Sequence, residues 1–355
     1  MTSRDDDPMD AGWSEAIRSI GKDFSEGERI VAADAIDASS IRRLCEVLEL
    51  DSALYHDREV ARSLGHRDIV APWSGISLTF TDPGLWHPGE PTRYPFANRN
   101  APPASPRALP ELRVPLPGPC SFLAVDLEIE YFKTVCAGDR LSIVGCRLLD
   151  VTPKATRLGS GAFLKFEKEI RDQRDDLIAV MRRTVFAYLK PDSEAPPTHV
   201  SREAGNDPAP QRYWEDVAPG DRLRSLDFAL TVDRLVAAAG ATRDFAAVHH
   251  DADAAKAAGA PDMFASNALI QGIWERMIRS FIGQQGAIMK VGPLRISDFS
   301  LCGETIVTEG KVKNKWLVKG EGCVELRLWS STERGPTVGA APVLVRLPCR
   351  RQEHQ

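Results

Sequence analysis

Hydrophobic positions recur with two different periods along the chain. In the second half, apolar side chains between residues 265 and 283 return every three or four positions, which predicts a long helix with one buried face. A shorter helix is predicted at 232–240. Strict alternation of apolar and polar residues, which is typical of strands, then marks four runs, at 294–301, 304–313, 322–329 and 337–347.

The first half repeats the same order of patterns. A helical stretch at 41–50 is followed by alternating runs at 123–132, 139–151, 161–170 and 177–189. A helix followed by about four antiparallel strands, in each half, predicts an α+β architecture in which a curled sheet wraps around a helix.

An internal duplication explains this repetition. Shifting the chain by 194 residues aligns 55–71 with 249–265 without a gap, and six of the seventeen positions are identical: His56/His250, Asp57/Asp251, Ala61/Ala255, Gly65/Gly259, Asp68/Asp262 and Ala71/Ala265. Farther along, 136–145 matches 301–310 at an offset of 165. The sequence therefore predicts two copies of one domain.

The composition places the boundaries of these copies. The segment 83–119 holds 11 of the 25 prolines and is expected to be an insertion in the first copy, because proline fixes φ and removes a backbone donor. The segment 191–212 has almost no large apolar residue and is expected to be a linker. The domains are thus predicted at 15–190, degenerate and non-catalytic, and at 213–349, catalytic.

Charge and composition exclude several kinds of partner. The 355-residue chain has a net charge of −5, which argues against nucleic acid as a partner. The chain contains no apolar run of the roughly 18 residues that a membrane span needs, and the first residues are acidic where a signal peptide would be basic, so a cytoplasmic protein is expected. The seven cysteines are scattered without a C-x-x-C pair, which argues against a disulfide framework or a structural zinc site.

The residues best suited to chemistry lie between 241 and 272. Asp244 and His249 are five positions apart on a short segment that leaves one helix, and a turn of small residues then leads to the next helix. This segment resembles the signature S-G-D-x-N-P-I-H-x-D of the MaoC-like, (R)-specific enoyl-CoA hydratase family. The resemblance implies a hotdog fold, and two copies in one chain resemble the double-hotdog hydratases.

The resemblance also implies roles for individual residues. Asp244 and His249 take the positions of the catalytic aspartate and histidine, and Asn267 that of the residue whose backbone N–H polarises the thioester carbonyl. We further expect a set of substrate-binding residues: Arg243, Phe245, Met263, Lys313 and Lys315. The chain departs from the signature where Arg243 replaces a glycine, Ala246 an asparagine, Ala247 a proline and Ser266 a histidine.

The implied reaction is hydration of a trans-2-enoyl thioester to the (R)-3-hydroxyacyl thioester, or the reverse dehydration. Such a reaction needs a base, an acid and donors for the charge that develops on the thioester oxygen, but no metal or organic cofactor. Coenzyme A, or an acyl-carrier protein, would be part of the substrate, and the protein could form a homodimer. Two alternatives remain: a non-catalytic acyl-thioester binding protein, which the loss of the motif asparagine would suit, and a hotdog acyl-CoA thioesterase.

Other polar clusters have simpler explanations. His249, His250 and Asp251 could suggest a metal site, but adjacent side chains diverge and the sequence offers no further His or Cys to complete a ligand set. Because His250 and Asp251 recur as His56 and Asp57, we expect them to be structural. The lysines at 311, 313, 315 and 319 could meet phosphates of coenzyme A or could simply be solvated.

The first copy lacks the catalytic pair. At the 194-residue offset it has Leu50 in place of Asp244, Tyr55 in place of His249 and Trp73 in place of Asn267. We therefore expect this half to be inactive, and to accept the distal part of a bulky acyl chain near residues 71–82.

Overall fold

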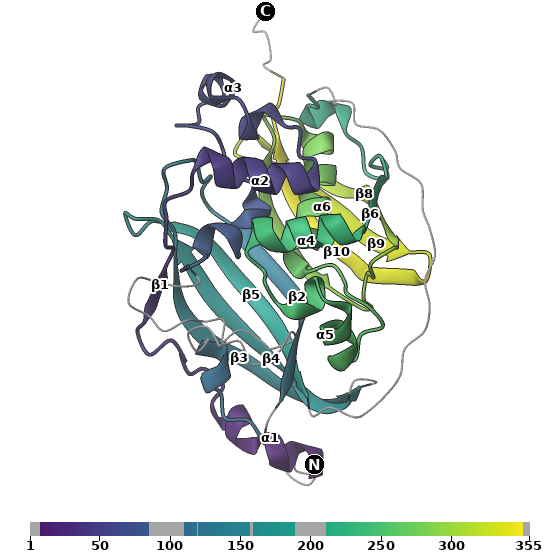
Figure 1. Ribbon diagram of the computed structural model, residues 1–355. Helices are drawn as coiled ribbons and strands as arrows, with labels where there is room; N and C mark the ends of the chain where they lie inside the picture. The colour runs from purple at the N-terminus through teal and green to yellow at the C-terminus, as the bar shows by residue number, and fades with distance from the viewer. Residues whose placement is uncertain (1–7, 85–109, 119, 157–158, 189–210, 351–355) are drawn as a thin grey trace, which may run out of the picture.

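The computed structural model describes residues 8–84, 110–118, 120–156, 159–188 and 211–350. Within them, one antiparallel sheet of ten strands runs in the order β1-β3-β4-β5-β2-β7-β10-β9-β8-β6 (Figure 1). The first half supplies β1 (Arg29–Val31), β2 (Ser121–Tyr131), β3 (Ser142–Thr156), β4 (Gly159–Arg171) and β5 (Leu177–Tyr188). The second half supplies β6 (Leu226–Ala229), β7 (Ala287–Arg295), β8 (Thr305–Val318), β9 (Glu321–Thr332) and β10 (Gly335–Leu347). Strands β2 and β7 pair at the centre, so the halves form one continuous sheet.

Three helices pack together on one face of this sheet, as Figure 1 shows. They are α2 (Ala38–Leu48), α4 (Val232–Thr242) and α6 (Asn267–Ile282). Helix α1 (Pro8–Arg18) and the shorter α3 (Arg58–Ser63) and α5 (Ala252–Ala257) lie outside this group. Helix α2 begins where the Asp37 side chain accepts the N–H of Ser40, and α4 where Thr231 accepts that of Arg234. These caps satisfy backbone donors that have no partner within the helix.

The structure confirms the duplication. Helices α2 and α3, and the 3₁₀ turn η2 (Ala53–Tyr55) between them, recur 194 residues later as α4, α5 and η7 (Ala247–His249). An isolated bridge joins Val70 to Cys136 in the first copy and Phe264 to Leu301 in the second, which reproduces both sequence offsets. The fold is a double hotdog of the α+β class.

The long helix, however, has no counterpart in the described part of the first copy. Where α6 lies in the second copy, the first has only two 3₁₀ turns, η3 (Trp73–Gly75) and η4 (Thr79–Thr81). Part of this stretch is tightly packed, because a Cβ atom on Gly75 would lie 2.4 Å from the Phe80 ring. Ala71, Trp73 and Ile76, by contrast, line a cavity of the first copy, so the expectation that an acyl chain lies near residues 71–82 stays a prediction.

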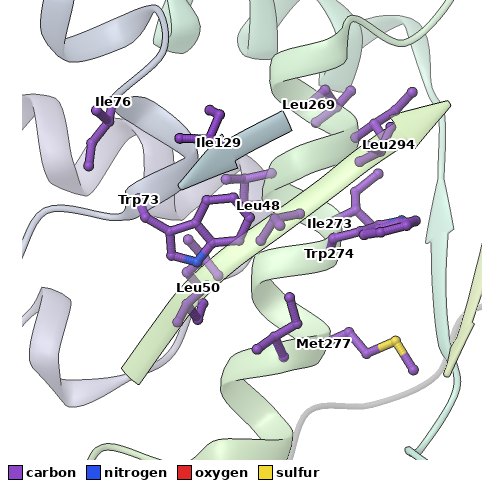
Figure 2. Packing of buried hydrophobic residues seen from close by; sticks show 14 of the residues in the cluster. Leu48, Leu50, Trp73, Ile76, Ile129, Leu269, Ile273, Trp274, Met277 and Leu294 are labelled. Atoms are coloured by element: carbon purple, nitrogen blue, oxygen red, sulfur yellow. The ribbon is translucent and has the colours of Figure 1, made fainter. Parts of the chain in front are cut away.

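Helix α6 is the centre of the main hydrophobic core, which draws on both halves (Figure 2). Trp274 and Met277 are 0% and 1% exposed, as expected from their helical spacing. Gly272 lets the helix approach α2 closely, since a Cβ atom there would lie 2.3 Å from Leu48. Packing against the first copy therefore fixes the position of helix α6.

The predicted elements are confirmed within a few residues, with one exception. The strand expected at 294–301 is wrong, because the strand is β7, which ends at Arg295. Residues beyond it turn, and the Asp298 side chain accepts the N–H of Phe299. Gly292 and Pro293 made β7 hard to predict from the sequence, since proline is rare in an inner strand. In the structure Pro293 lies at a shift in the register between β7 and β2.

Two predicted regions fall largely outside the described residues. Of the insertion at 83–119, the structure describes residues 83–84 and 110–118. The second of these ranges includes the turn η5 (Pro110–Arg113). Of the linker at 191–212, it describes only 211 and 212. Among the described helices, none has the length and apolar character needed to cross a membrane.

Candidate active site

The loop after α4 carries the predicted catalytic pair. Arg243 follows helix α4 as its C-cap residue. Its φ of 62° lies in the left-handed region and turns the chain away from the helix axis. Asp244 follows directly, and its N–H donates to the Thr242 hydroxyl at 3.4 Å. The turn η7 then brings His249 back toward Asp244.

The geometry of the pair assigns the state of the histidine. Nδ1 of His249 lies 2.9 Å from the carbonyl oxygen of Phe264, and a carbonyl only accepts, so Nδ1 carries the hydrogen. In the neutral imidazole, Nε2 is then an acceptor, and it lies 3.7 Å from Oδ2 of Asp244. Both side chains are partly exposed, at 14% and 25%. With the imidazole neutral, the pair therefore presents two acceptors, His249 Nε2 and Asp244 Oδ2, on partly exposed side chains.

Phe264 holds the histidine in two ways, and the sequence did not identify it. Besides accepting from Nδ1, Phe264 places its ring edge-on to the imidazole, with centroids 5.1 Å apart. The Phe264 ring in turn packs on Phe299. Because the bridge from Phe264 to Leu301 fixes its backbone, the orientation of His249 depends on the segment between β7 and β8.

Helix α6 begins three residues beyond Phe264, whose carbonyl binds this histidine. Ser266 caps the helix by accepting the N–H of Leu269, a role that its place before an apolar helical run could have predicted. Within the described residues, no acceptor binds the N–H of Asn267 or of Ala268. Two backbone donors and the positive end of the helix dipole are therefore available beside His249.

The structure brings some of the other predicted residues near the pair. Arg243 precedes Asp244, binds Asp82 of the first copy at 2.7 Å and lies over the Phe245 ring. Phe245 is 41% exposed. Met263 is buried, and its carbonyl accepts the N–H of Cys302, so its backbone serves the sheet.

The two lysines lie elsewhere. Lys313 and Lys315 are on β8, eight and ten residues beyond Thr305, which corresponds to about 26 and 33 Å of strand. The Lys315 ammonium binds the carbonyl of Trp214 and lies over its ring. Among the described residues, no hydrogen bond or ion pair joins either lysine to Asp244 or His249.

The residues that follow His249 have structural roles. Asp251 caps α5 by accepting the N–H groups of Asp253 and Ala254, and Asp57 caps α3 in the same way. His250 contacts the carbonyl of Phe245 at 3.4 Å. Within the described residues, no group of three or more His, Cys, Asp or Glu side chains is arranged to hold a metal ion.

The first copy keeps the scaffold of this site, and a carboxylate from the second copy fills it. Trp73 and Ser74, which correspond to Asn267 and Ala268, donate their N–H groups to the two oxygens of Glu275 at 3.2 and 3.0 Å. Tyr55, in the position of His249, donates its hydroxyl to the same carboxylate. Glu275 belongs to α6 of the second copy and is 0% exposed.

This arrangement shows where an acceptor oxygen fits in the scaffold. Burial raises the pKa of Glu275, against the opposing hydrogen bonds from Ser74 and Tyr55 and the charge of Arg279. Burial also raises the pKa of Tyr55, so its hydroxyl stays protonated and donates. The Glu275 carboxylate thus binds the amides of Trp73 and Ser74, and it also binds Tyr55, the residue in the position of His249. By the internal symmetry, the open donors of Asn267 and Ala268 can receive an oxygen beside His249.

Comparisons with known proteins find relatives by sequence and by structure. The family model described as the dehydratase domain region of FAS1-like proteins matches residues 19–181, which lie in the first copy. A protein of Thermomonospora curvata named probable enoyl-CoA hydratase alpha subunit is 26% identical over 216 residues, which are 58% of this chain. The chain spans 61% of the length of that relative.

Solved structures share the fold. A MaoC-like dehydratase superposes with a TM-score of 0.64 at 18% identity, over 91% of this chain and 99% of that one. A Mycobacterium tuberculosis protein described as having a double hotdog fold superposes with a TM-score of 0.60 at 12% identity, over 92% and 98% of the two chains. At these identities the likeness establishes the fold alone.

Proposed function

We propose that this chain, a double-hotdog protein of the MaoC-like family, adds water reversibly to a trans-2-enoyl thioester and gives the (R)-3-hydroxyacyl thioester. The observation that carries the proposal is the pair of acceptors, His249 Nε2 and Asp244 Oδ2, 3.7 Å apart beside the open amides of α6. The sequence match to a probable enoyl-CoA hydratase subunit supports the same class of reaction.

The chemistry assigns a role to each group. A water molecule between His249 and Asp244 would donate a hydrogen bond to each, and one of the pair would remove its proton as the oxygen bonds to C3. The electron pair of the C2–C3 double bond moves toward the thioester, and the N–H of Asn267 would stabilise the resulting enolate oxygen. The same proton then returns to C2, which completes the addition.

No metal or organic cofactor takes part in this proposal. Coenzyme A would enter as part of the substrate. Arg243, held by Asp82, would fix the backbone before Asp244 and border the entrance together with Phe245. Ala246, in place of the motif asparagine, removes one amide that could have ordered the pair.

The direct test is an assay of the purified full chain with crotonyl-CoA and with longer trans-2-enoyl-CoA substrates. Loss of the conjugated-thioester absorbance, with an (R)-3-hydroxyacyl product on a chiral column, is the expected result. A thiol-trapping reagent present in the same assay distinguishes a thioesterase, which would release free coenzyme A. If the chain binds enoyl-CoA but neither reaction occurs, it is a binding protein and the proposal is wrong.

A further inference from the structure

A cavity of about 690 Å³ lies over the inactive site of the first copy. Its walls come from the segment 54–76, the end of β2 with the turn after it, the end of α6, and parts of β7 and β10. Its volume is within the range of small-molecule sites. Neither Asp244 nor His249 lines it, so it is separate from the candidate active site.

The described lining is rich in hydrogen-bond donors and holds no carboxylate. Three cations line it: Lys133, Arg279 and Arg346. Lys133 pairs with Asp176, and Arg346 with Glu321, and neither of these acids belongs to the lining. An anionic group entering the cavity would therefore meet positive side chains and no lining acid.

Arg279 is the cation best placed to hold such a group. Its hydrogen-bond partners are the Tyr55 hydroxyl and the carbonyls of Gly283 and Gly286, all of them neutral. The nearest carboxylate, Glu275, is already bound by Tyr55 and by the backbone of Trp73 and Ser74. Guanidinium groups bind carboxylate and phosphate oxygens strongly, because both partners are charged.

The rest of the lining is apolar or aromatic. Leu54, Ile76, Ile288 and Trp73 contribute to it. The indole N–H of Trp73 is buried and has no hydrogen-bond partner among the described residues. Such a surface suits a ligand with a hydrocarbon or pantetheine-like portion next to its charged end.

The floor of the cavity prevents reaction. Glu275 occupies the amides that could polarise a carbonyl, and the first copy has Leu50 and Tyr55 where the second has its acid and base. We propose that the cavity is a second, non-catalytic binding site for an amphipathic organic anion, with its carboxylate or phosphate held by Arg279. The site does not depend on the hydratase activity proposed above.

Titration of the full chain, followed by the indole N–H signal of Trp73 in ¹⁵N-labelled protein, tests this proposal. The signal is assigned from its absence in Trp73→Phe, and the probes are octanoate, coenzyme A and inorganic phosphate. We expect a saturable shift with octanoate or with coenzyme A, in the wild type and equally in His249→Ala. Arg279→Gln should weaken binding at least tenfold, whereas Arg327→Gln should not, because Arg327 is a half-buried arginine on β9 outside the cavity lining.

The two organic probes distinguish a carboxylate ligand from a phosphate ligand, and a response to either supports the site. A shift with inorganic phosphate alone, no saturable shift, unchanged affinity in Arg279→Gln, or loss of binding in His249→Ala would each overturn the proposal. A second measurement does not depend on any variant: crystals grown with 8-bromooctanoate should show the anomalous signal of bromine in the cavity. Bromine only at the Asp244 site would contradict the proposal.

Discussion

Replacing Glu275 by glutamine tests whether the first copy depends on the carboxylate that helix α6 of the second copy places in it. The glutamine carbonyl can still accept from Tyr55 and Trp73, but its amide nitrogen faces the N–H of Ser74, so two donors meet. Loss of one hydrogen bond to a charged group, together with an unsatisfied buried donor, should cost about 1–3 kcal/mol of unfolding free energy. Glu275→Ala leaves three donors without an acceptor, and should cost about 3–5 kcal/mol.

Urea denaturation at neutral pH measures these differences. Glu46→Gln is the matched control, since Glu46 is 58% exposed and forms a surface pair with Arg42, worth roughly 0.3–0.5 kcal/mol. The expected order of stability is wild type, Glu46→Gln, Glu275→Gln and Glu275→Ala. If Glu275→Gln is as stable as Glu46→Gln, the carboxylate does not hold the amides of the first copy. Glu275 would then give no reason to expect that the amides of Asn267 and Ala268 bind an oxygen.

Three further predictions follow from the packing. Gly272→Ala should lower stability by about 1–3 kcal/mol in a urea titration, because its Cβ would meet Leu48, and a gain equal to the usual helix propensity would contradict this. Lys168→Met should lower stability by about 3–5 kcal/mol, because it leaves the buried Glu111 without its partner. Although burial opposes it, Lys168 holds the pKa of Glu111 below its ordinary value, so in the wild type this stabilisation is present above a pH of about 4.3 and is lost as pH falls. Burial raises the pKa of Cys146 to about 12, so this thiol should resist iodoacetamide in native protein at pH 8, as mass spectrometry of the modified sites would show.

The sequence was sufficient for the fold and for the local part of the site. Period-two runs predicted most strands, since side chains on one face of the sheet enter the core, and the duplication predicted equivalent elements in each half. Asp244 and His249 come together because both follow the end of helix α4 and only one short turn separates them. Local spacing alone carries this information.

What the sequence could not predict depends on long-range contacts. The bond from His249 to Phe264 requires the bridge of that segment to Leu301. Glu275 reaches the amide of Trp73 from 202 residues away, across the interface of the halves. No sequence pattern predicts that a glutamate within an apolar helix binds the backbone amides of a distant segment.

The most direct test of the proposed hydratase is the rate of crotonyl-CoA hydration by Asp244→Asn and His249→Ala. Removing a positioned acid or base should lower kcat/KM by roughly 100-fold or more in each variant. His250→Ala, which changes the neighbouring imidazole, should stay close to the wild type. Circular dichroism should show that all three variants are folded. Folded Asp244→Asn or His249→Ala with nearly wild-type turnover would contradict the assignment of that residue.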